Sequence, residues 1–209
     1  MKRIIYLAST LLVFAAALQL CAAETAKQTT ETSVKKRIAL LNLNEAVTKA
    51  TMKRLKTYAE RQLRIKTDII EKDVDKDIKK LSKYAENIDQ SDDFKENYPV
   101  IVAVCSSESS EEHVYTSDSK RITVINIIPL QTSKDERFVQ RLERLMMRGA
   151  GKAAGLGFDP DPHCVMHSYK TIEDLDKMGR NFSPPWQAMF NSAAKRMGLE
   201  IIPYSPKKP

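Results

Sequence analysis

The most informative segment of this 209-residue chain is Arg148–Met166, which reads RGAGKAAGLGFDPDPHCVM. It begins inside a helical pattern, because the apolar residues before and within it recur at three- and four-residue intervals. These residues are Phe138, Val139, Leu142, Leu145, Met146, Ala150 and Ala153. We therefore predict a long, partly buried helix near Asp135–Ala154, with Ser133 as its N-cap and Gly155 as its C-terminal cap.

Apolar and β-branched runs upstream of this helix predict a sheet. Arg37–Leu43 (RIALLNL) and Pro99–Cys105 (PVIVAVC) are typical of buried strands. Arg121–Leu130 (RITVINIIPL) is predicted to be another β-branched strand, and Leu63–Ile70 is a further strand candidate. Between them, helical spacing predicts one helix through Met52, Leu55, Ala59 and Leu63, and a second over Asp77–Ile88. Strands alternating with helices predict a single α/β domain, with a twisted, mixed and mostly parallel sheet flanked by helices.

The first 23 residues have the layout of a secretory signal. Lys2 and Arg3 precede an apolar run that ends at Leu20, and Cys21-Ala22-Ala23 then offers small residues for cleavage. The alternatives are a retained anchor helix and a lipoprotein acylated at Cys21. The bulky Leu20 disfavours the lipoprotein. We predict an exported protein, periplasmic or secreted, without a transmembrane segment after signal removal.

Composition narrows the function classes. The chain is 42% hydrophobic and 29% charged, which is ordinary for a globular domain. Loss of the signal removes two positive charges and lowers the formal net charge from +7 to +5. In an exported protein we interpret this surplus as solubility or attraction to anionic envelope components, not as nucleic-acid binding. We predict a flexible leader over residues 24–36, a folded domain over 37–202 and a tail over 203–209.

The segment Arg148–Met166 resembles the signature of the archaemetzincins, a metzincin-clan family of zinc metallopeptidases. That signature is H-E-x-x-H-x-x-G-x-x-H-C-x(4)-C-x-M, followed downstream by C-x-x-C. Gly155, Cys164 and Met166 match the turn glycine, the second Cys and the turn Met, at the family's spacing. Ser168–Gln187 is similar to the family's stretch that leads into C-x-x-C. The resemblance implies an archaemetzincin-like fold with a Met-turn beneath a former active-site helix.

The zinc and catalytic positions of that signature differ in this chain. The three ligand positions hold Arg148, Lys152 and Phe158, and the general-base position holds Gly149. Three of the four positions for structural zinc thiolates hold Asp159, Ser183 and Trp186. A guanidinium stays charged and an exposed lysine stays protonated at neutral pH, so neither ligates a metal. The resemblance thus implies a pseudopeptidase for which no cofactor is expected.

The two cations of this segment admit two interpretations. They could form an anion site in the former cleft that binds a peptide or protein, since Arg suits a carboxylate. The candidates for such binding are Arg148, Lys152, Phe158 and Met166. Alternatively, Arg148 and Lys152 are solvated charges or form salt bridges to Asp159 and Asp161. A hollow at Lys152 and Phe158 would favour binding, and a filled cleft would favour a structural role in the cell envelope.

A rebuilt metal site is a further alternative. Asp159, His163, Cys164 and His167 are close in sequence and could hold zinc in a peptidase or other hydrolase with relocated ligands. Against this alternative, no helix-borne His pair survives to organise the metal. We also expect an edge strand at Thr123–Ile128 that could pair with an extended peptide. Cys105 and Cys164 could pair, but their spacing alone does not decide it.

Two packing features complete the predictions. Gly149 and Gly151 weaken a helix by roughly 1 kcal/mol each relative to Ala, so their presence predicts close packing against a neighbouring element. Phe158, Phe182 and Trp186 are candidates to fill the space that a structural zinc would occupy.

Overall fold

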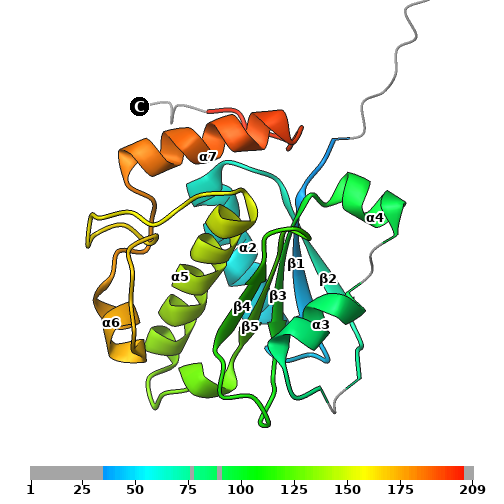
Figure 1. The fold of residues 1–209 in the computed structure, drawn as a ribbon, viewed down its shortest axis with the longest axis vertical. Coiled ribbons are helices and arrows are strands. Elements are labelled where there is room, and N and C mark those ends of the chain that lie inside the picture. The colour runs from blue at the N-terminus through cyan, green and yellow to red at the C-terminus, as the bar shows by residue number, and fades with distance from the viewer. Residues whose placement is uncertain (1–34, 76–77, 89–90, 205–209) are drawn as a thin grey trace, which may run out of the picture. The chain divides into compact units, whose positions relative to one another are not determined.

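A five-stranded sheet forms the centre of the molecule, in the order β2-β1-β3-β5-β4 (Figure 1). The structure is a computed structural model that describes residues 35–75, 78–88 and 91–204. The strands are β1 Ile38–Leu43, β2 Thr67–Lys72, β3 Val100–Cys105, β4 Val114–Ser117 and β5 Ile122–Asn126. β1, β2, β3 and β5 run parallel, and β4 pairs antiparallel with β5. The predicted α/β class with a mixed sheet is confirmed.

Helices cover both faces of this sheet (Figure 1), which is why the inner strands β1, β3 and β5 are buried along their whole length. The helices are α2 Lys49–Leu63, α3 Leu81–Asn87, α4 Asp92–Asn97, α5 Asp135–Ala153, α6 Ile172–Lys177 and α7 Pro184–Arg196, with a 3₁₀ turn, η1, at Ile128–Leu130. Along β1, Ile38 and Leu40 belong to the core under α2 and α5. The alternate residues Ala39 and Leu41 belong to the core under α3. None of the helices in the described ranges is long and apolar enough to cross a membrane.

Helix α5 has the predicted extent but a different N-cap. It spans Asp135–Ala153, and Gly155 follows it with a φ of 86°, in the left-handed conformation that caps a helix C-terminus. Ser133 is not the cap residue. Lys134 occupies the N-cap position, and its side chain makes no cap hydrogen bond. The acidic residues Asp135 and Glu136 in the first turn interact favourably with the helix dipole instead.

Three sheet predictions need correction. The second strand is Thr67–Lys72 and not Leu63–Ile70, because α2 continues through Leu63 and ends at Arg64, whose φ is 59°. The strand after Arg121 stops at Asn126, where the chain enters the 3₁₀ turn η1. Strand β5 is also not an edge strand, because it lies between β3 and β4. The two edge strands are β2 and β4, and β4 lies inside a stretch that the sequence pattern did not mark.

The second predicted helix is shorter than expected, and the ends of the chain remain predictions. Helix α3 covers Leu81–Asn87 within the predicted 77–88 range, and Tyr84 and Ala85 are buried as the spacing indicated. The expected signal over residues 1–23 lies outside the described residues. So do residues 24–34 of the predicted leader and 205–209 of the predicted tail.

Two glycines let α5 approach its neighbours more closely than any other residue would allow. A Cβ at Gly149 would lie 2.7 Å from Thr123 Cγ2 on β5, and Thr123 Oγ1 donates to the Gly149 carbonyl at 3.3 Å. A Cβ at Gly151 would lie 2.9 Å from Met166 Sδ and 3.0 Å from the Phe182 ring. The predicted close packing is therefore confirmed on both sides of the helix.

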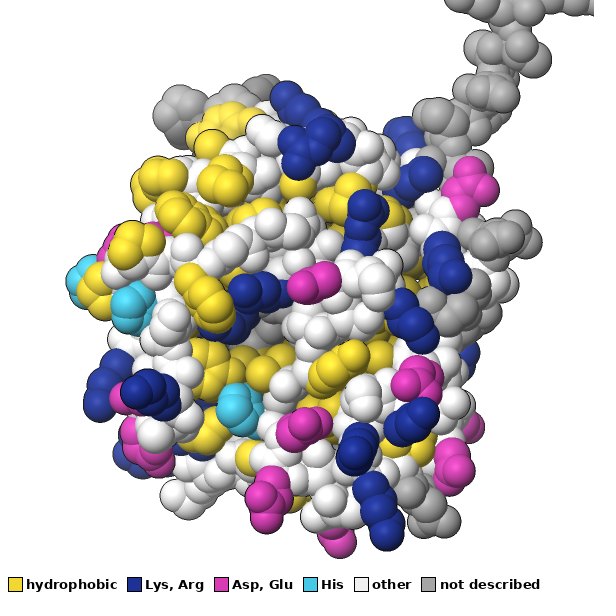
Figure 2. All heavy atoms as spheres, in the orientation of Figure 1, with side chains coloured by type: hydrophobic (Ala, Val, Ile, Leu, Met, Phe, Trp, Pro, Cys, Tyr) yellow, Lys and Arg dark blue, Asp and Glu magenta, His cyan; other side chains and the backbone are white. Residues whose placement is uncertain are grey.

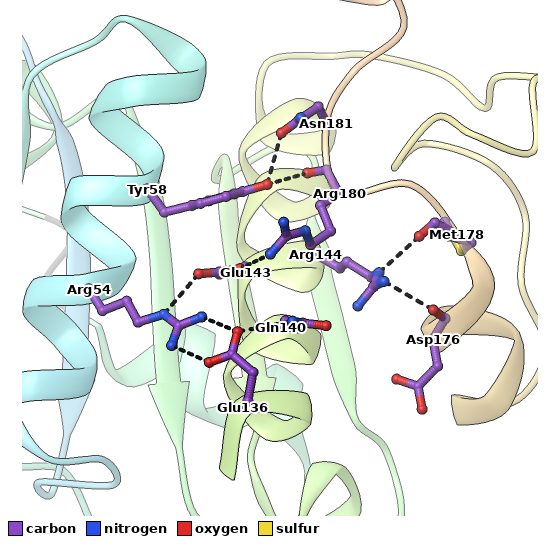
Figure 3. A network of polar contacts seen from close by, with 10 residues as sticks. All are labelled: Arg54, Tyr58, Glu136, Gln140, Glu143, Arg144, Asp176, Met178, Arg180 and Asn181. Atoms are coloured by element: carbon purple, nitrogen blue, oxygen red, sulfur yellow. Dashed lines mark hydrogen bonds and ion pairs between the residues drawn. The ribbon is translucent and has the colours of Figure 1, made fainter. Parts of the chain in front are cut away.

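A buried carboxylate on α5 connects that helix to α2 and to the segment that follows α6 (Figure 3). Glu143 is 3% exposed and accepts from Arg54 Nε on α2 and from an Arg180 amino group, each at 3.1 Å. Arg54 also makes two bonds to Glu136, at 2.6 and 2.7 Å. On the same helix face, Arg144 donates to the main-chain carbonyl of Met178. This network attaches the segment after α6 to the face of α5 that lies opposite the sheet.

The substitution Glu143→Gln should lower the free energy of unfolding by about 1–3 kcal/mol, because it removes the charge that both guanidiniums share. Urea unfolding followed by circular dichroism measures the change. Glu86→Gln is the matched control, since Glu86 pairs with Lys83 on an exposed helix surface and should leave the midpoint unchanged. Equal midpoints for the two variants would contradict a stabilising role for the network.

Gly149→Ala should destabilise the fold by about 1–3 kcal/mol through overlap with Thr123, a cost that the better helix propensity of Ala offsets only in part. The double variant Gly149→Ala/Thr123→Ser should recover part of this loss. Ser lacks the methyl group that the new Cβ meets, and it keeps the hydroxyl that binds the Gly149 carbonyl. If the losses of stability in Gly149→Ala and in Thr123→Ser simply added up in the double variant, the proposed contact between the two residues would be wrong.

Candidate binding cleft

Two cations and two aromatic rings come together beside the C-terminal half of α5. Lys152 Nζ lies 3.9 Å from the centroid of the Phe158 ring. Arg148 Cζ lies 5.2 Å from the same centroid and 5.0 Å from that of Tyr169. We call Arg148, Lys152, Phe158 and Tyr169 the cation–aromatic cluster. The first three are the residues that the archaemetzincin resemblance put at zinc-ligand positions, and Tyr169 was not predicted.

Arg148 holds the turn that contains Met166. One of its terminal nitrogens donates to the Val165 carbonyl at 3.0 Å and to the His167 carbonyl at 2.6 Å. Met166 is fully buried between these residues, with its sulfur against the backbone of α5 at Gly151. Burial lowers the pKa of Arg148, since its charged form has lost much of its water.

Lys152 is half-buried and rests on a ring instead of a carboxylate. Burial and the neighbouring Arg148 both lower its pKa. A lysine over an aromatic face gains about 0.5–1 kcal/mol at an exposed site and more when desolvated. Within the described residues, neither Arg148 nor Lys152 forms the salt bridge to Asp159 or Asp161 that one interpretation proposed.

His113 and Tyr169 connect the sheet edge to the segment after the Met166 turn. His113 directly precedes β4, and its Nε2 lies 2.7 Å from the Tyr169 hydroxyl. Burial lowers the pKa of His113, and Arg148 lowers it further. Burial raises the pKa of Tyr169 to about 12. The pair is therefore neutral, with one hydrogen bond between its two polar atoms. No sequence signal marked His113, because it lies in a polar loop 56 residues from its partner.

Three polar residues join the loop after α5 to the start of α7. Ser183 Oγ donates to the Asp159 carboxylate, and the Ser183 amide donates to Cys164 Sγ at 3.2 Å. The same sulfur accepts from the Met166 amide at 3.4 Å, and burial raises the pKa of the Cys164 thiol. Nearby, Trp186 Nε1 donates to the Gly157 carbonyl at 3.1 Å. Direct hydrogen bonds thus hold this corner together.

The residues of the alternative metal site have other partners. His167 Nδ1 lies 3.0 Å from the Asp159 carbonyl, and His163 is exposed. In the part of the chain that the structure describes, no three His, Cys, Asp or Glu side chains are arranged to hold a metal ion. Cys164 is a free, buried thiol, as is Cys105 on β3, so the two do not form the disulfide left open by the sequence.

Of the predicted aromatic fillers, two pack and one does not. Phe182 is buried and its ring lies 5.4 Å from that of Phe190, and Trp186 is partly buried against the core. Phe158 is 57% exposed, so its prediction as a filler is wrong. Its ring covers the two cations of α5 instead, and the attraction between the ring and these cations favours its position at the surface.

A hollow of about 570 Å³ opens beside Lys152, at the C-terminal end of α5. Phe158 does not line it. Figure 2 shows Lys and Arg side chains in and around a depression near the middle of this face, with hydrophobic side chains close by. A larger hollow, of about 680 Å³, lies at Asn42, Glu71 and Asp135, away from the cation–aromatic cluster.

Comparison with solved structures shows an archaemetzincin-like fold. The chain is similar to the archaemetzincin of Methanopyrus kandleri, with a TM-score of 0.65 and 14% identity over 80% of this chain and 99% of that one. It is also similar to a zinc-dependent peptidase from Methanocorpusculum labreanum, with a TM-score of 0.58 and 14% identity over 73% and 100% of the chains. The archaemetzincin of Archaeoglobus fulgidus, solved with malonate, matches with a TM-score of 0.56 and 14% identity over 73% and 98%. No protein-family model and no curated protein sequence matches the chain.

The half-buried His113 should make stability depend on pH. Its pKa in the folded state lies below the usual 6.5, so between those two values the unfolded chain binds more protons than the folded one. The free energy of unfolding should therefore fall as the pH drops below about 6.5. Urea midpoints measured across this range should fall less steeply for His113→Gln than for the unmodified protein. Identical slopes for the two proteins would contradict this assignment.

Proposed function

We propose that this chain is an exported, non-catalytic protein that binds a peptide or protein segment. The proposed site is the surface formed by strand β4 and the cation–aromatic cluster, which we call the proposed cleft. The observation that carries the proposal is the convergence of Arg148, Lys152 and Phe158 on one point. That point corresponds, by the archaemetzincin resemblance, to the position of the catalytic zinc. Export rests on the signal-like first 23 residues.

Zinc does not fit the side chains at this point. Zinc binds through thiolate, imidazole or carboxylate lone pairs. A guanidinium has no free lone pair, a protonated lysine has none, and a phenyl ring offers no ligand atom. Gly149 stands where the resemblance expects a general base, and two cations would repel a divalent ion. We therefore do not propose zinc-dependent hydrolysis at this site.

Direct contacts between residues replace the structural zinc that the archaemetzincin resemblance implies. Asp159, Cys164, Ser183 and Trp186 stand at its four ligand positions. The first three are joined by direct hydrogen bonds, and Trp186 bonds to the adjacent Gly157 carbonyl. A structural zinc site can contribute roughly 10–16 kcal/mol to a small fold. Hydrogen bonds and the Phe182–Phe190 contact take its place here, which supports retention of the fold without the metal.

The edge strand supports the choice of a peptide as ligand. Within the described residues β4 pairs with β5 alone, which leaves its outer main-chain groups available to an added strand. The four residues Val114–Ser117 are only half-buried. The cation–aromatic cluster lies beside α5, which also contacts β4. Its guanidinium and amine would attract a carboxylate, and the exposed Phe158 ring offers apolar contact area.

The substitution Phe158→Ser tests this cleft. A library of fluorescent peptides is screened by anisotropy for binders, and the best binder is then titrated against the variants. We expect Phe158→Ser to weaken binding by about tenfold, as loss of an aromatic anchor of 1–2 kcal/mol implies. Tyr204→Ser is the matched control, because Tyr204 is another exposed aromatic residue, 78% exposed, outside the cluster.

Two outcomes would overturn the proposal. Equal losses of peptide affinity in Phe158→Ser and Tyr204→Ser would show that the cleft is not the binding site. Chelator-sensitive peptide cleavage by the purified protein, or stoichiometric zinc in its metal analysis, would instead support the peptidase with relocated ligands. We expect no cleavage with or without added zinc.

A further inference from the structure

A strongly basic hollow adjoins the proposed cleft and is not explained by it. Its volume is about 570 Å³, and it lies among the ends of α5 and α7, the β4–β5 turn and the residues just before β3. Five cationic side chains line it: Lys36, Lys95, Arg121, Lys152 and Arg196. Asp118 is the single carboxylate that lines it among the residues that the structure describes. We call this the basic hollow.

Within the described part of the chain, these five cations form none of the ion pairs that neutralise other cations of the fold. Arg54, Arg141 and Arg180 each pair with a carboxylate within 3.1 Å. Among the described residues, no ion pair involves any of the five cations of the basic hollow. The C-terminal ends of α5 and α7 each add about half a negative charge. With Asp118, they leave an excess of roughly three positive charges around one concave surface.

We propose that the basic hollow binds acidic side chains of the same polypeptide that occupies the cleft, so that the ligand is an Asp- or Glu-rich segment. This inference rests on the proposed function. The two sites are continuous through Lys152, which lines the basic hollow and also covers the Phe158 ring. An extended segment along β4 reaches the β4–β5 turn, where Asp118 and Arg121 line the hollow.

The arrangement of the cations favours several carboxylates over one phosphate. They come from five separate segments of the chain around a hollow of about 570 Å³, whereas a phosphate is gripped by donors that converge on one point. The lining between them includes Pro99, Ala153 and Met197, which suits the aliphatic parts of a peptide. A polypeptide with spaced acidic side chains matches both the charges and the apolar surface.

The test compares acidic peptides with two double variants of the protein. Lys95→Gln/Arg196→Gln removes two exposed cations of the basic hollow, and Lys79→Gln/Arg137→Gln removes two exposed cations elsewhere. The probes are a fluorescent peptide containing six glutamates, the same peptide with glutamines, and inorganic pyrophosphate as a competitor. At low salt, we expect the first double variant to weaken binding of the glutamate peptide by about five- to tenfold, and the second by less than about twofold.

Each outcome bears on a different claim. Equal loss of glutamate-peptide binding in the two double variants would show that the basic hollow is not the site for acidic side chains, because only the net charge of the protein would then matter. Loss confined to Phe158→Ser, with Lys95→Gln/Arg196→Gln unchanged, would overturn this inference and leave the proposed cleft intact. Displacement of the glutamate peptide by stoichiometric pyrophosphate would identify a phosphate site and also reject it. Failure of every peptide to bind would reject the proposed function itself.

Discussion

The close approach of the α5 backbone to its two neighbours is the constraint on which the other features depend. Gly149 meets Thr123 of β5 on one side, and Gly151 meets Met166 and Phe182 on the other. With the rotation of the helix fixed in this way, residues 148 and 152 must share the remaining side, since they are one turn apart. The shared side of Arg148 and Lys152 is thus a consequence of backbone packing, and the rings of Phe158 and Tyr169 then pack over these two cations.

Helix α5 carries two groups of cations whose electrostatic surroundings differ. Arg141 faces the α6 side, where the Asp176 carboxylate neutralises it. Arg144 lies on the same side and donates to the main-chain carbonyls of Asp176 and Met178. Arg148 and Lys152 face carbonyls and ring faces instead, which solvate a cation without cancelling its charge. The first group stabilises the fold. The second keeps a positive potential at the cleft, which is the property that a site for an anionic ligand needs.

Parts of this picture followed from sequence because their signals are local or have fixed spacing. The apolar runs of β1 and β3, the period of α5 and the spacing of Gly155, Cys164 and Met166 are of this kind. Strand β4 carried no such signal, because its four half-buried residues, Val114–Ser117, show no clean alternation. The contact of His113 with Tyr169 joins residues that only the folded sheet brings together. The exposure of Phe158 was also not predictable, since local sequence does not say whether a ring packs inward or over a cation.

The two separate thiols have a consequence for how such a protein matures. Cys105 and Cys164 are buried apart from each other, and burial raises the pKa of Cys105 to about 12, so the native state presents almost no reactive thiolate. The unfolded chain has no such protection, and an oxidising compartment could join the two sulfurs, which belong to different core clusters in the native fold. If the chain is exported, its folding must therefore outpace oxidation, and reducing conditions would favour its recovery in native form.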